Sequence, residues 1–336
     1  MDHTRPTSRR VLRAAAVGGA VVAVPVLQAP AAQALSGWPT FTHRGVPFRR
    51  EDLAYNPTDE LIFPCIRLVA GRAADPLGRW YLYYSPHNAP GGICMAYGNS
   101  LGGPFTEYSA NPVVARTWAP HHSVSHVASP HVLWNEANRT FYLYYHGENT
   151  TTRLARSADG LNWTYDRAIL TTADLPENVT ETSYARAFRH AIPGRGNTYI
   201  MLFMGNQAGT RKIFLAWSGD QRRWTVQQTP LVSPAGDGAT QIANPTFALK
   251  NGIPHVIYNS VDAIHVTRVG TDFDQEVHLG VMYEPTTAAP DLGRAAAPSF
   301  AQENGVVHMF YEAGARLHGR IARATAAAIP GLSFRT

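Results

Sequence analysis

Cysteine, helical periodicity and long apolar runs are all scarce in this chain of 336 residues. Its only two cysteines, Cys65 and Cys94, are too few for a disulfide framework. After residue 34, no stretch approaches the apolar length that spans a bilayer. Helical periodicity is nearly absent, and glycine, asparagine and proline punctuate short strand-like segments. These absences exclude a helical bundle and a helical membrane protein, and they favour an all-β fold.

Blocks of basic residues are also missing, although the formal net charge is +5. Without such a block or a recognisable nucleic-acid motif, DNA and RNA are not expected as partners. The positive charge fits an anionic partner instead, such as an acidic polysaccharide. With 45% hydrophobic and 16% charged residues, the chain has enough apolar sequence for a large core and does not read as disordered.

The first 34 residues read as an export signal. Arg9 and Arg10 precede an apolar run, and the segment ends in the small-residue pattern Ala32-Gln33-Ala34. The arginine pair resembles the twin-arginine type of signal, whose cargo crosses the membrane already folded. The alternative, a single membrane anchor, is disfavoured by Pro25 and Pro30 within the segment. We therefore expect residues 35–336 to form a secreted domain, free of the membrane after signal removal and monomeric.

Residues 35–336 are internally repetitive. Five aromatic-rich segments recur at intervals of roughly 50 to 60 residues: RWYLYYSP, RTFYLYYHG, NTYIMLFMG, GIPHVIYNS and GVVHMFYEAG. Each follows a strand that often opens with proline, as in SPHVLW and NPTFAL, and each precedes a third strand. A fourth, edge-like strand follows in most copies, as in WTVQQTPLV. Repeats of this length with four strands each are typical of propeller blades.

Five copies predict a five-bladed β-propeller with four-stranded antiparallel blades. The last copy lacks its outer strand, and the segment from Trp38 to Tyr55 is expected to supply it and close the ring. The rival fold is a β-sandwich with irregular loops, which the regular three-strand register disfavours.

The segments DPLGRWYLYYS, ARSADGLNWT and AWSGDQRRWT resemble the family 43 glycoside hydrolases and their five-bladed relatives. The resemblance spans residues 35–336 and rests on scaffold patterns, including a turn at Asp159 and a similar turn at Asp220. It implies carbohydrate chemistry, with carboxylates at the starts of particular inner strands. Such hydrolysis uses two carboxylates that flank the glycosidic bond.

This chain departs from that pattern at the expected positions. They read Phe63-Pro64, Ser129-Pro130-His131, Tyr184-Ala185 and Ala243-Asn244-Pro245. None of these is acidic, so the usual carboxylate trio is absent. His131 stands where the related hydrolases show an acidic residue.

Antiparallel order predicts which side chains meet. The start of a blade's first strand, the end of its second and the start of its third lie at one end of the sheet, around the axis where propellers hold pockets. The expected catalytic residues are His126, His131, His146, Tyr184, Glu148 and Glu181. The expected substrate-binding residues are His87, Arg153, Arg186, Arg211, Asn244, Glu312, Arg316 and His318.

Two chemistries remain open for this set. Histidine can abstract a proton near neutral pH, tyrosine can donate one, and arginine matches a carboxylate. His126, His146, Tyr184 and Arg186 therefore resemble the His/Tyr/Arg set of propeller polysaccharide lyases. Carboxylates offer the alternative of a rearranged hydrolase pair, drawn from Glu60, Glu148, Glu181 and Glu312.

We expect a secreted enzyme that cleaves glycosidic bonds in an extracellular polysaccharide or oligosaccharide, with an acidic one among the candidates and hydrolysis favoured over elimination on a uronate. A sugar-binding propeller without catalysis is the third possibility. No cofactor is assigned. A structural cation on the axis, held by a histidine through water, is the one metal site considered, since the histidines lack zinc-site spacing.

Overall fold

The computed structural model describes residues 35–234, 239–287 and 291–336. The chain divides into two units, residues 1–33 and 34–336. The first unit, and with it the expected signal peptide, lies outside the described residues. Within the described ranges, no helix is long and apolar enough to cross a membrane.

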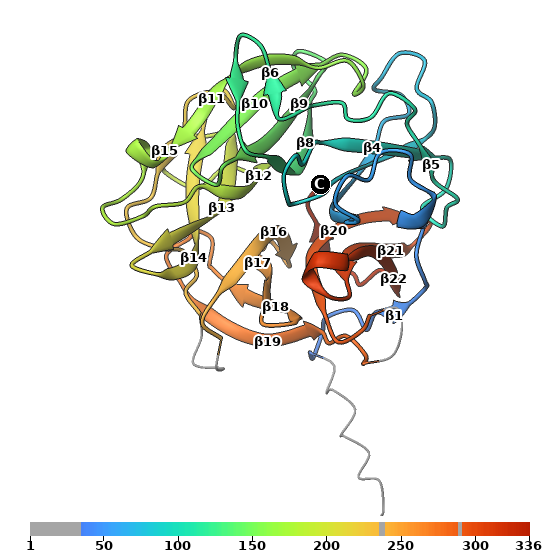
Figure 1. Ribbon diagram of the computed structural model, residues 1–336. Helices are drawn as coiled ribbons and strands as arrows, with labels where there is room; N and C mark the ends of the chain where they lie inside the picture. The colour runs from blue at the N-terminus through green and yellow to red at the C-terminus, as the bar shows by residue number, and fades with distance from the viewer. Residues whose placement is uncertain (1–34, 235–238, 288–290) are drawn as a thin grey trace, which may run out of the picture. The chain divides into compact units, whose positions relative to one another are not determined.

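The second unit is a five-bladed β-propeller, as predicted, and the sandwich alternative is wrong. Figure 1 shows the blades around a central axis, with β8, β12, β16 and β20 among the inner strands. Blade one contains β2 (Ile62–Leu68), β3 (Trp80–Ser85), β4 (Cys94–Gly98) and β5 (Thr106–Glu107). Blade two contains β8 (Val127–Asn135), β9 (Thr140–Gly147), β10 (Thr151–Ser157) and β11 (Thr164–Thr171). Blade three contains β12 (Ser183–Arg189), β13 (Tyr199–Gln207), β14 (Thr210–Ser218) and β15 (Thr225–Val226).

The last two blades involve the ends of the described chain. Blade four contains β16 (Ile242–Lys250), β17 (Ile253–Ser260), β18 (Ala263–Arg268) and β19 (Val277–Tyr283). Blade five contains β20 (Ala295–Glu303), β21 (Val306–Ala313), β22 (Arg320–Ala327) and β1 (Thr42–His43). Because β1 pairs antiparallel with β22, the prediction that residues 38–55 complete the last blade is confirmed.

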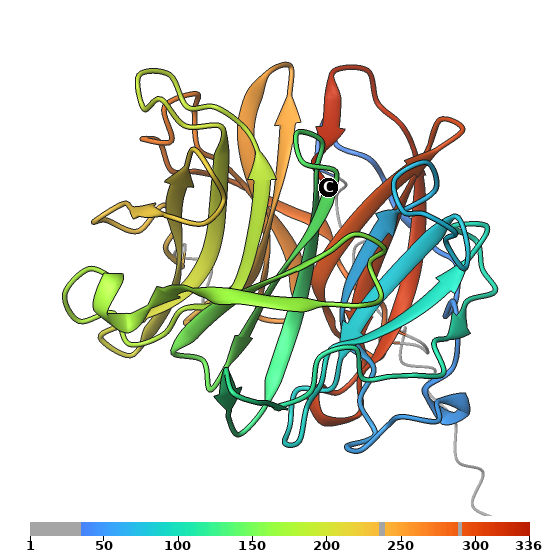
Figure 2. The same ribbon diagram turned by 90° about the horizontal axis from the view of Figure 1, so that it is seen from above.

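Shorter elements connect the blades. A two-stranded sheet of β6 (Thr117–Trp118) and β7 (His122–Ser123) follows blade one. Three 3₁₀ segments are η1 (Arg50–Asp52), η2 (Thr172–Asp174) and η3 (Arg316–His318). Figure 2 shows the blades from above.

The sequence did not predict β23 (Leu332–Phe334). This strand pairs with β16, the innermost strand of blade four, through Ala248, Leu249 and Lys250. Its Phe334 ring stacks on Phe300 of blade five, with 4.0 Å between ring centroids. The last residues therefore seal the end of the axis opposite the start of β16.

Aromatic second strands build the core, as their alternation of large apolar side chains suggests. Tyr81, Tyr83, Tyr84, Tyr144, Tyr145 and Tyr311 are all fully buried. The apolar clusters lie mostly between neighbouring blades, since one joins residues of β3 and β9 and another joins residues of β9 and β13. Both cysteines are buried and free.

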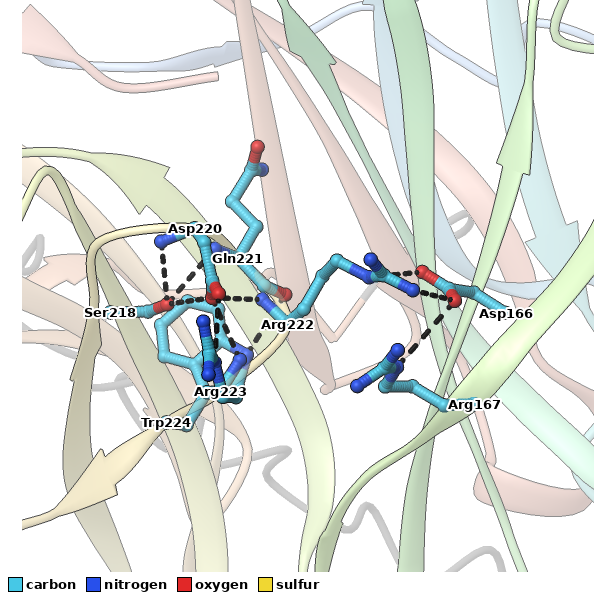
Figure 3. Close-up of polar contacts among 8 residues, drawn as sticks. All are labelled: Asp166, Arg167, Ser218, Asp220, Gln221, Arg222, Arg223 and Trp224. Atoms are coloured by element: carbon cyan, nitrogen blue, oxygen red, sulfur yellow. Dashed lines mark hydrogen bonds and ion pairs between the residues drawn. The ribbon is translucent and has the colours of Figure 1, made fainter.

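Asp159 and Asp220 stabilise turns, as expected from the repeated Ser-x-Asp pattern. Figure 3 shows the second turn, in which Oγ of Ser218 accepts the backbone N–H of Asp220 and Gln221 at 3.1 and 2.9 Å. Oδ1 of Asp220 accepts the N–H groups of Arg222 and Arg223, each at 2.9 Å. These bonds satisfy backbone donors that the hairpin leaves open.

Buried polar side chains tie the inner strands together below the bulged end of the propeller. Arg67 of blade one donates through Nε to the Val132 carbonyl of blade two. His131 of blade two bonds the Ala187 carbonyl of blade three at 2.7 Å. Arg186 of blade three donates to the Pro298 carbonyl of blade five. Each side chain thus links its blade to another through a main-chain acceptor.

Candidate active site

All five inner strands carry the same β-bulge near their first residues. In each strand, two residues oppose one residue of the second strand, and the ladder register shifts there. The first bulged residue has a positive φ between 48° and 55° in every blade. These residues are Phe63, Ser129, Tyr184, Asn244 and Ala297. In four blades the next residue is proline, which lacks the N–H that a regular ladder would use.

The five bulges correspond to the strand starts that the sequence singled out. Bulges re-aim side chains and recur beside active sites, and a non-glycine residue at positive φ is strained. None of the five bulged residues is acidic. Phe63, Tyr184 and Ala297 instead join an apolar cluster with Ile62 and Ala128.

A cavity of about 450 Å³ opens at this end of the propeller. Blades one, three, four and five supply its walls. Its lining includes Phe63, His87, Tyr184, Arg211, Gln241, Asn244, Asn259, Arg294, Glu312 and Arg316. Six of the predicted site residues therefore lie on one cavity: His87, Tyr184, Arg211, Asn244, Glu312 and Arg316.

Two carboxylates stand near this cavity, each held by an arginine. Glu312 is 1% exposed and forms an ion pair with Arg294, which also lines the cavity. Glu181 lies 3.4 Å from Arg211 and accepts a bond from the Asn206 amide at 3.2 Å. The paired arginines supply opposite charge, which makes burial of each carboxylate tolerable.

Arg316 is the lining guanidinium whose charge has no counterpart. No ion pair with it occurs in the described part of the chain. With Arg211 and Arg294 balanced by glutamates, this residue leaves the cavity with a net positive charge. An anionic or strongly polar ligand is favoured there.

Three histidines form one side of the site. The ring centroids of His87 and His126 are 5.4 Å apart, and those of His126 and His146 are 5.9 Å apart. His146 in turn lies 5.1 Å from the Tyr184 ring. Burial, followed by repulsion from His87, lowers the pKa of His126.

The neutral ring of His146 has a buried N–H group that lacks a hydrogen-bond acceptor. Burial lowers its pKa well below the usual value, and His126 and His87 add to that effect. Its Nδ1 accepts the backbone N–H of Tyr184 at 3.3 Å, so the neutral ring carries its proton on Nε2. That nitrogen is buried without a hydrogen-bond partner.

Tyr184 occupies the centre of these groups. Its pKa is raised by burial, while Arg211 and Arg316 lower it and Glu312 and Glu181 raise it further. The phenol therefore keeps its proton near neutral pH and can donate a hydrogen bond into the cavity.

Unpaired polar atoms concentrate around the same end of the propeller. They include Nε2 of His146, Oδ1 of Asn206 and Asn244, and Oε2 of Glu181 and Glu312. Buried polar groups are nearly always hydrogen-bonded in native proteins. Of these residues, Asn244 and Glu312 line the cavity, so their unpaired oxygens suit the hydroxyl groups of a ligand there.

Two of the predicted site residues, His131 and Arg186, lie among buried contacts between blades. His131 is 2% exposed, and its ring bonds both Arg67, at 3.0 Å, and the Ala187 carbonyl. Arg186 is 3% exposed and reaches the Pro298 carbonyl. Neither lines the cavity, and each follows the bulge of its strand and bonds to another blade. Their contacts are those of structural residues.

Six more predicted residues do not line the cavity: His126, His146 and Glu181, described above, and Glu148, Arg153 and His318. Glu148 and Arg153 form an ion pair of 2.8 Å at the top of blade two. His318 is 66% exposed and lies 3.5 Å from Asp59. Glu60, also considered as an acid, accepts the backbone N–H groups of His87 and Asn88 and so anchors their loop.

Sequence reasoning missed Arg294. A signal was present: the residue three positions before each bulge is polar in every blade. These residues are Glu60, His126, Glu181, Gln241 and Arg294. Among the described residues, no group of three or more histidine, cysteine, aspartate or glutamate side chains is placed to hold a metal ion.

No protein-family model matches the chain, and no curated protein matches its sequence. Solved structures do resemble it. A glycoside hydrolase superposes with a TM-score of 0.65 and 13% identity, over 86% of this chain and 92% of its own. An α-L-arabinofuranosidase from Lactobacillus brevis gives 0.58 and 13%, over 83% and 94%. A β-1,2-mannobiose phosphorylase from Listeria innocua, in complex with β-1,2-mannobiose, gives 0.55 and 14%, over 70% and 67%.

These structural neighbours are glycoside hydrolases and another enzyme of glycan chemistry. The predicted resemblance to the five-bladed hydrolase structures is thereby confirmed at the level of the fold. Since the identities are low, function has to be argued from the site itself.

Proposed function

We propose that this protein is a carbohydrate-active enzyme that hydrolyses glycosidic bonds in its axial cavity, with Glu312 and Glu181 in place of the usual carboxylates. The observation that carries the proposal is Glu312. It is a buried carboxylate on the cavity, held by Arg294, with Oε2 free of any hydrogen bond. The hydrolase neighbours of this fold support the choice of chemistry.

The roles follow from what each group touches. Glu312 is the carboxylate placed to accept the proton of an attacking water or to bond the sugar carbon. Glu181 is the second carboxylate, and to protonate the leaving oxygen it has to exchange its Arg211 ion pair for a proton when the glycan binds. Tyr184 and Asn244 also line the cavity and supply hydrogen bonds to sugar hydroxyls.

Elimination on a uronate is the second candidate. It is favoured by Arg316, whose charge suits a uronate carboxylate, and by the contact between His146 and Tyr184. It is disfavoured by Arg186, the arginine of the His/Tyr/Arg set, which donates to the Pro298 carbonyl and does not line the cavity. We therefore rank hydrolysis first.

The test is a glycan panel that includes neutral arabinose-, mannose- and galactose-containing polymers and uronate-rich polymers. Hydrolysis releases reducing ends without the absorbance of an unsaturated uronate.

Glu312→Gln is expected to lower turnover by roughly 10²- to 10⁴-fold, with Tyr184→Phe lowering it less. Full activity of Glu312→Gln would refute the proposed roles. Reducing ends accompanied by unsaturated-uronate absorbance would establish the lyase. Sugar binding without turnover would leave a binding module.

The location of this activity is also part of the proposal. The N-terminal segment with Arg9 and Arg10 supports export to the outside of the cytoplasm, where an extracellular glycan would be the substrate. Replacing both arginines by lysine should keep the protein in the producing cells. Unchanged export of that variant would contradict a twin-arginine route.

A further inference from the structure

An arginine cluster stands on the outer part of blades two and three. Asp166 of β11 is 4% exposed and lies among three guanidiniums. Arg222 donates two hydrogen bonds to Asp166, from Nε to Oδ2 at 2.9 Å and from Nη2 to Oδ1 at 2.6 Å. Arg156 and Arg167 approach through Nε at 3.4 and 3.5 Å. Figure 3 shows Arg167 and Arg222 converging on Asp166 from β11 and from the turn after β14.

The charges of this cluster do not balance. Three guanidiniums surround one carboxylate, and Asp166 is already fully engaged by Arg222. Nε of Arg156 and of Arg167 have no hydrogen-bond partner. An ion-pair network built only for stability would bring a second carboxylate to these arginines, and none lies within ion-pair distance in the described residues.

The unbalanced arginines also face solvent. The side chains of Arg156, Arg167 and Arg222 are 42%, 42% and 36% exposed. They belong to the outer strands β10 and β11 and to an inter-strand turn, whereas the cavity is lined by inner strands and the loops beside them. The arginine cluster is therefore a surface of its own, separate from the proposed active site.

We propose that the arginine cluster binds the carboxylate groups of a uronate-bearing polysaccharide chain. A guanidinium fork matches a carboxylate in two-toothed fashion, and the buried Asp166 holds the forks in place before binding, so that less side-chain freedom is lost. A polymer with repeated carboxylates can engage several arginines at once. The choice of a polysaccharide over another polyanion rests on the proposed function.

The test uses the full chain and polygalacturonate as the probe, in affinity electrophoresis at neutral pH. Arg156→Gln with Arg167→Gln removes the two weakly held arginines and keeps the Arg222–Asp166 bonds, so folding should be preserved. Affinity is expected to fall by about tenfold, and parent binding should weaken as salt rises. The matched control is Arg49→Gln with Arg189→Gln, which removes the same charge elsewhere and should bind like the parent.

Equal retardation of the double variant and the parent would overturn the proposal. So would retardation by duplex DNA but not by polygalacturonate, since the cluster would then serve another polyanion. A failure of the proposed function is separable, because Glu312→Gln should bind polygalacturonate as the parent does. The double variant should also keep parent turnover on a short substrate that reaches only the cavity.

Discussion

At the scale of single residues, two buried histidines with similar sequence settings have different surroundings. His131 is fully bonded between Arg67 and the Ala187 carbonyl. His146 keeps an unpaired Nε2 next to Tyr184. Both were expected at the pocket, because the start of a first strand and the end of a second strand lie at the same end of the sheet. The bulge at Ser129 and Pro130 inserts an extra residue, and alternation across it no longer predicts direction.

Replacing His131 should affect stability rather than chemistry. His131→Phe leaves the Ala187 carbonyl and one Arg67 nitrogen unpaired in the interior, at a cost of about 1–3 kcal/mol for each lost partner. Urea unfolding measures that loss. Turnover of the folded variant, measured well below its melting temperature, should stay within a factor of two or so of the parent. Loss of turnover without loss of stability would restore His131 to the active site.

Buried neutral histidines also set a pH dependence. Burial holds the pKa values of His131 and His146 well below 6.5 in the folded state. As the pH falls below about 6.5, the two imidazole rings become protonated in the unfolded chain and stay neutral in the folded chain. Above about pH 6.5 the free energy of unfolding should therefore contain the whole contribution of both histidines. As the pH drops below that value, the free energy of unfolding should decrease by up to about 1.4 kcal/mol per pH unit for each histidine.

The matched variant for this effect is His146→Gln, which removes one such group. Its unfolding free energy should depend less steeply on pH between about 6.5 and 4.5 than that of the parent. Parallel curves for the two proteins would show that His146 takes up its proton in the folded state.

At the scale of elements, the inner-strand bulge is the unit that positions the site. Five bulges with positive φ place Phe63, Ser129, Tyr184, Asn244 and Ala297 at equivalent points around the axis. The sequence predicted the strands and their order, and the prolines marked four of the bulges. It could not show left-handed backbone, because Ala185 replaces the proline in blade three and none of the bulged residues is glycine.

The bulge without proline offers a stability test. Ala185→Pro would give blade three the dipeptide geometry that the other four blades already have. Since proline restricts the unfolded chain, the variant is expected to gain about 0.4–1 kcal/mol. Thermal and urea unfolding measure the gain, with Pro130→Ala as the reverse change that should lose a similar amount. A strongly destabilised Ala185→Pro protein would mean that blade three has its own backbone requirement.

At the scale of the whole molecule, the ring is closed by β1 on blade five, and its axial end is covered by β23. Closure was predictable, since the last repeat visibly lacked a strand. The cover was not, because Leu332–Phe334 carries no repeat pattern and its pairing with β16 adds a strand on the inner side of a complete blade. Arg294 was missed for a related reason: its partner Glu312 becomes a neighbour only through the hairpin of blade five.

The axial cover should contribute measurably to stability. Phe334→Ala removes the ring that stacks on Phe300 and packs against Phe41, for a loss of about 1–3 kcal/mol. Ser333→Ala, in the same strand, should stay within about 0.5 kcal/mol of the parent. Calorimetry distinguishes the two. Similar small losses for both variants would show that the cover is not part of the cooperative unit.

Ring closure through β1 also constrains the order of events during biosynthesis. His43 meets Tyr311 across 268 residues of chain, a contact of very high sequence separation that favours slow folding. Residues 42–43 are made long before their partner strand β22, which spans Arg320–Ala327. Strand β1 can pair with β22 only after almost the entire polypeptide has been made. The propeller can therefore complete its fold only after synthesis has nearly ended.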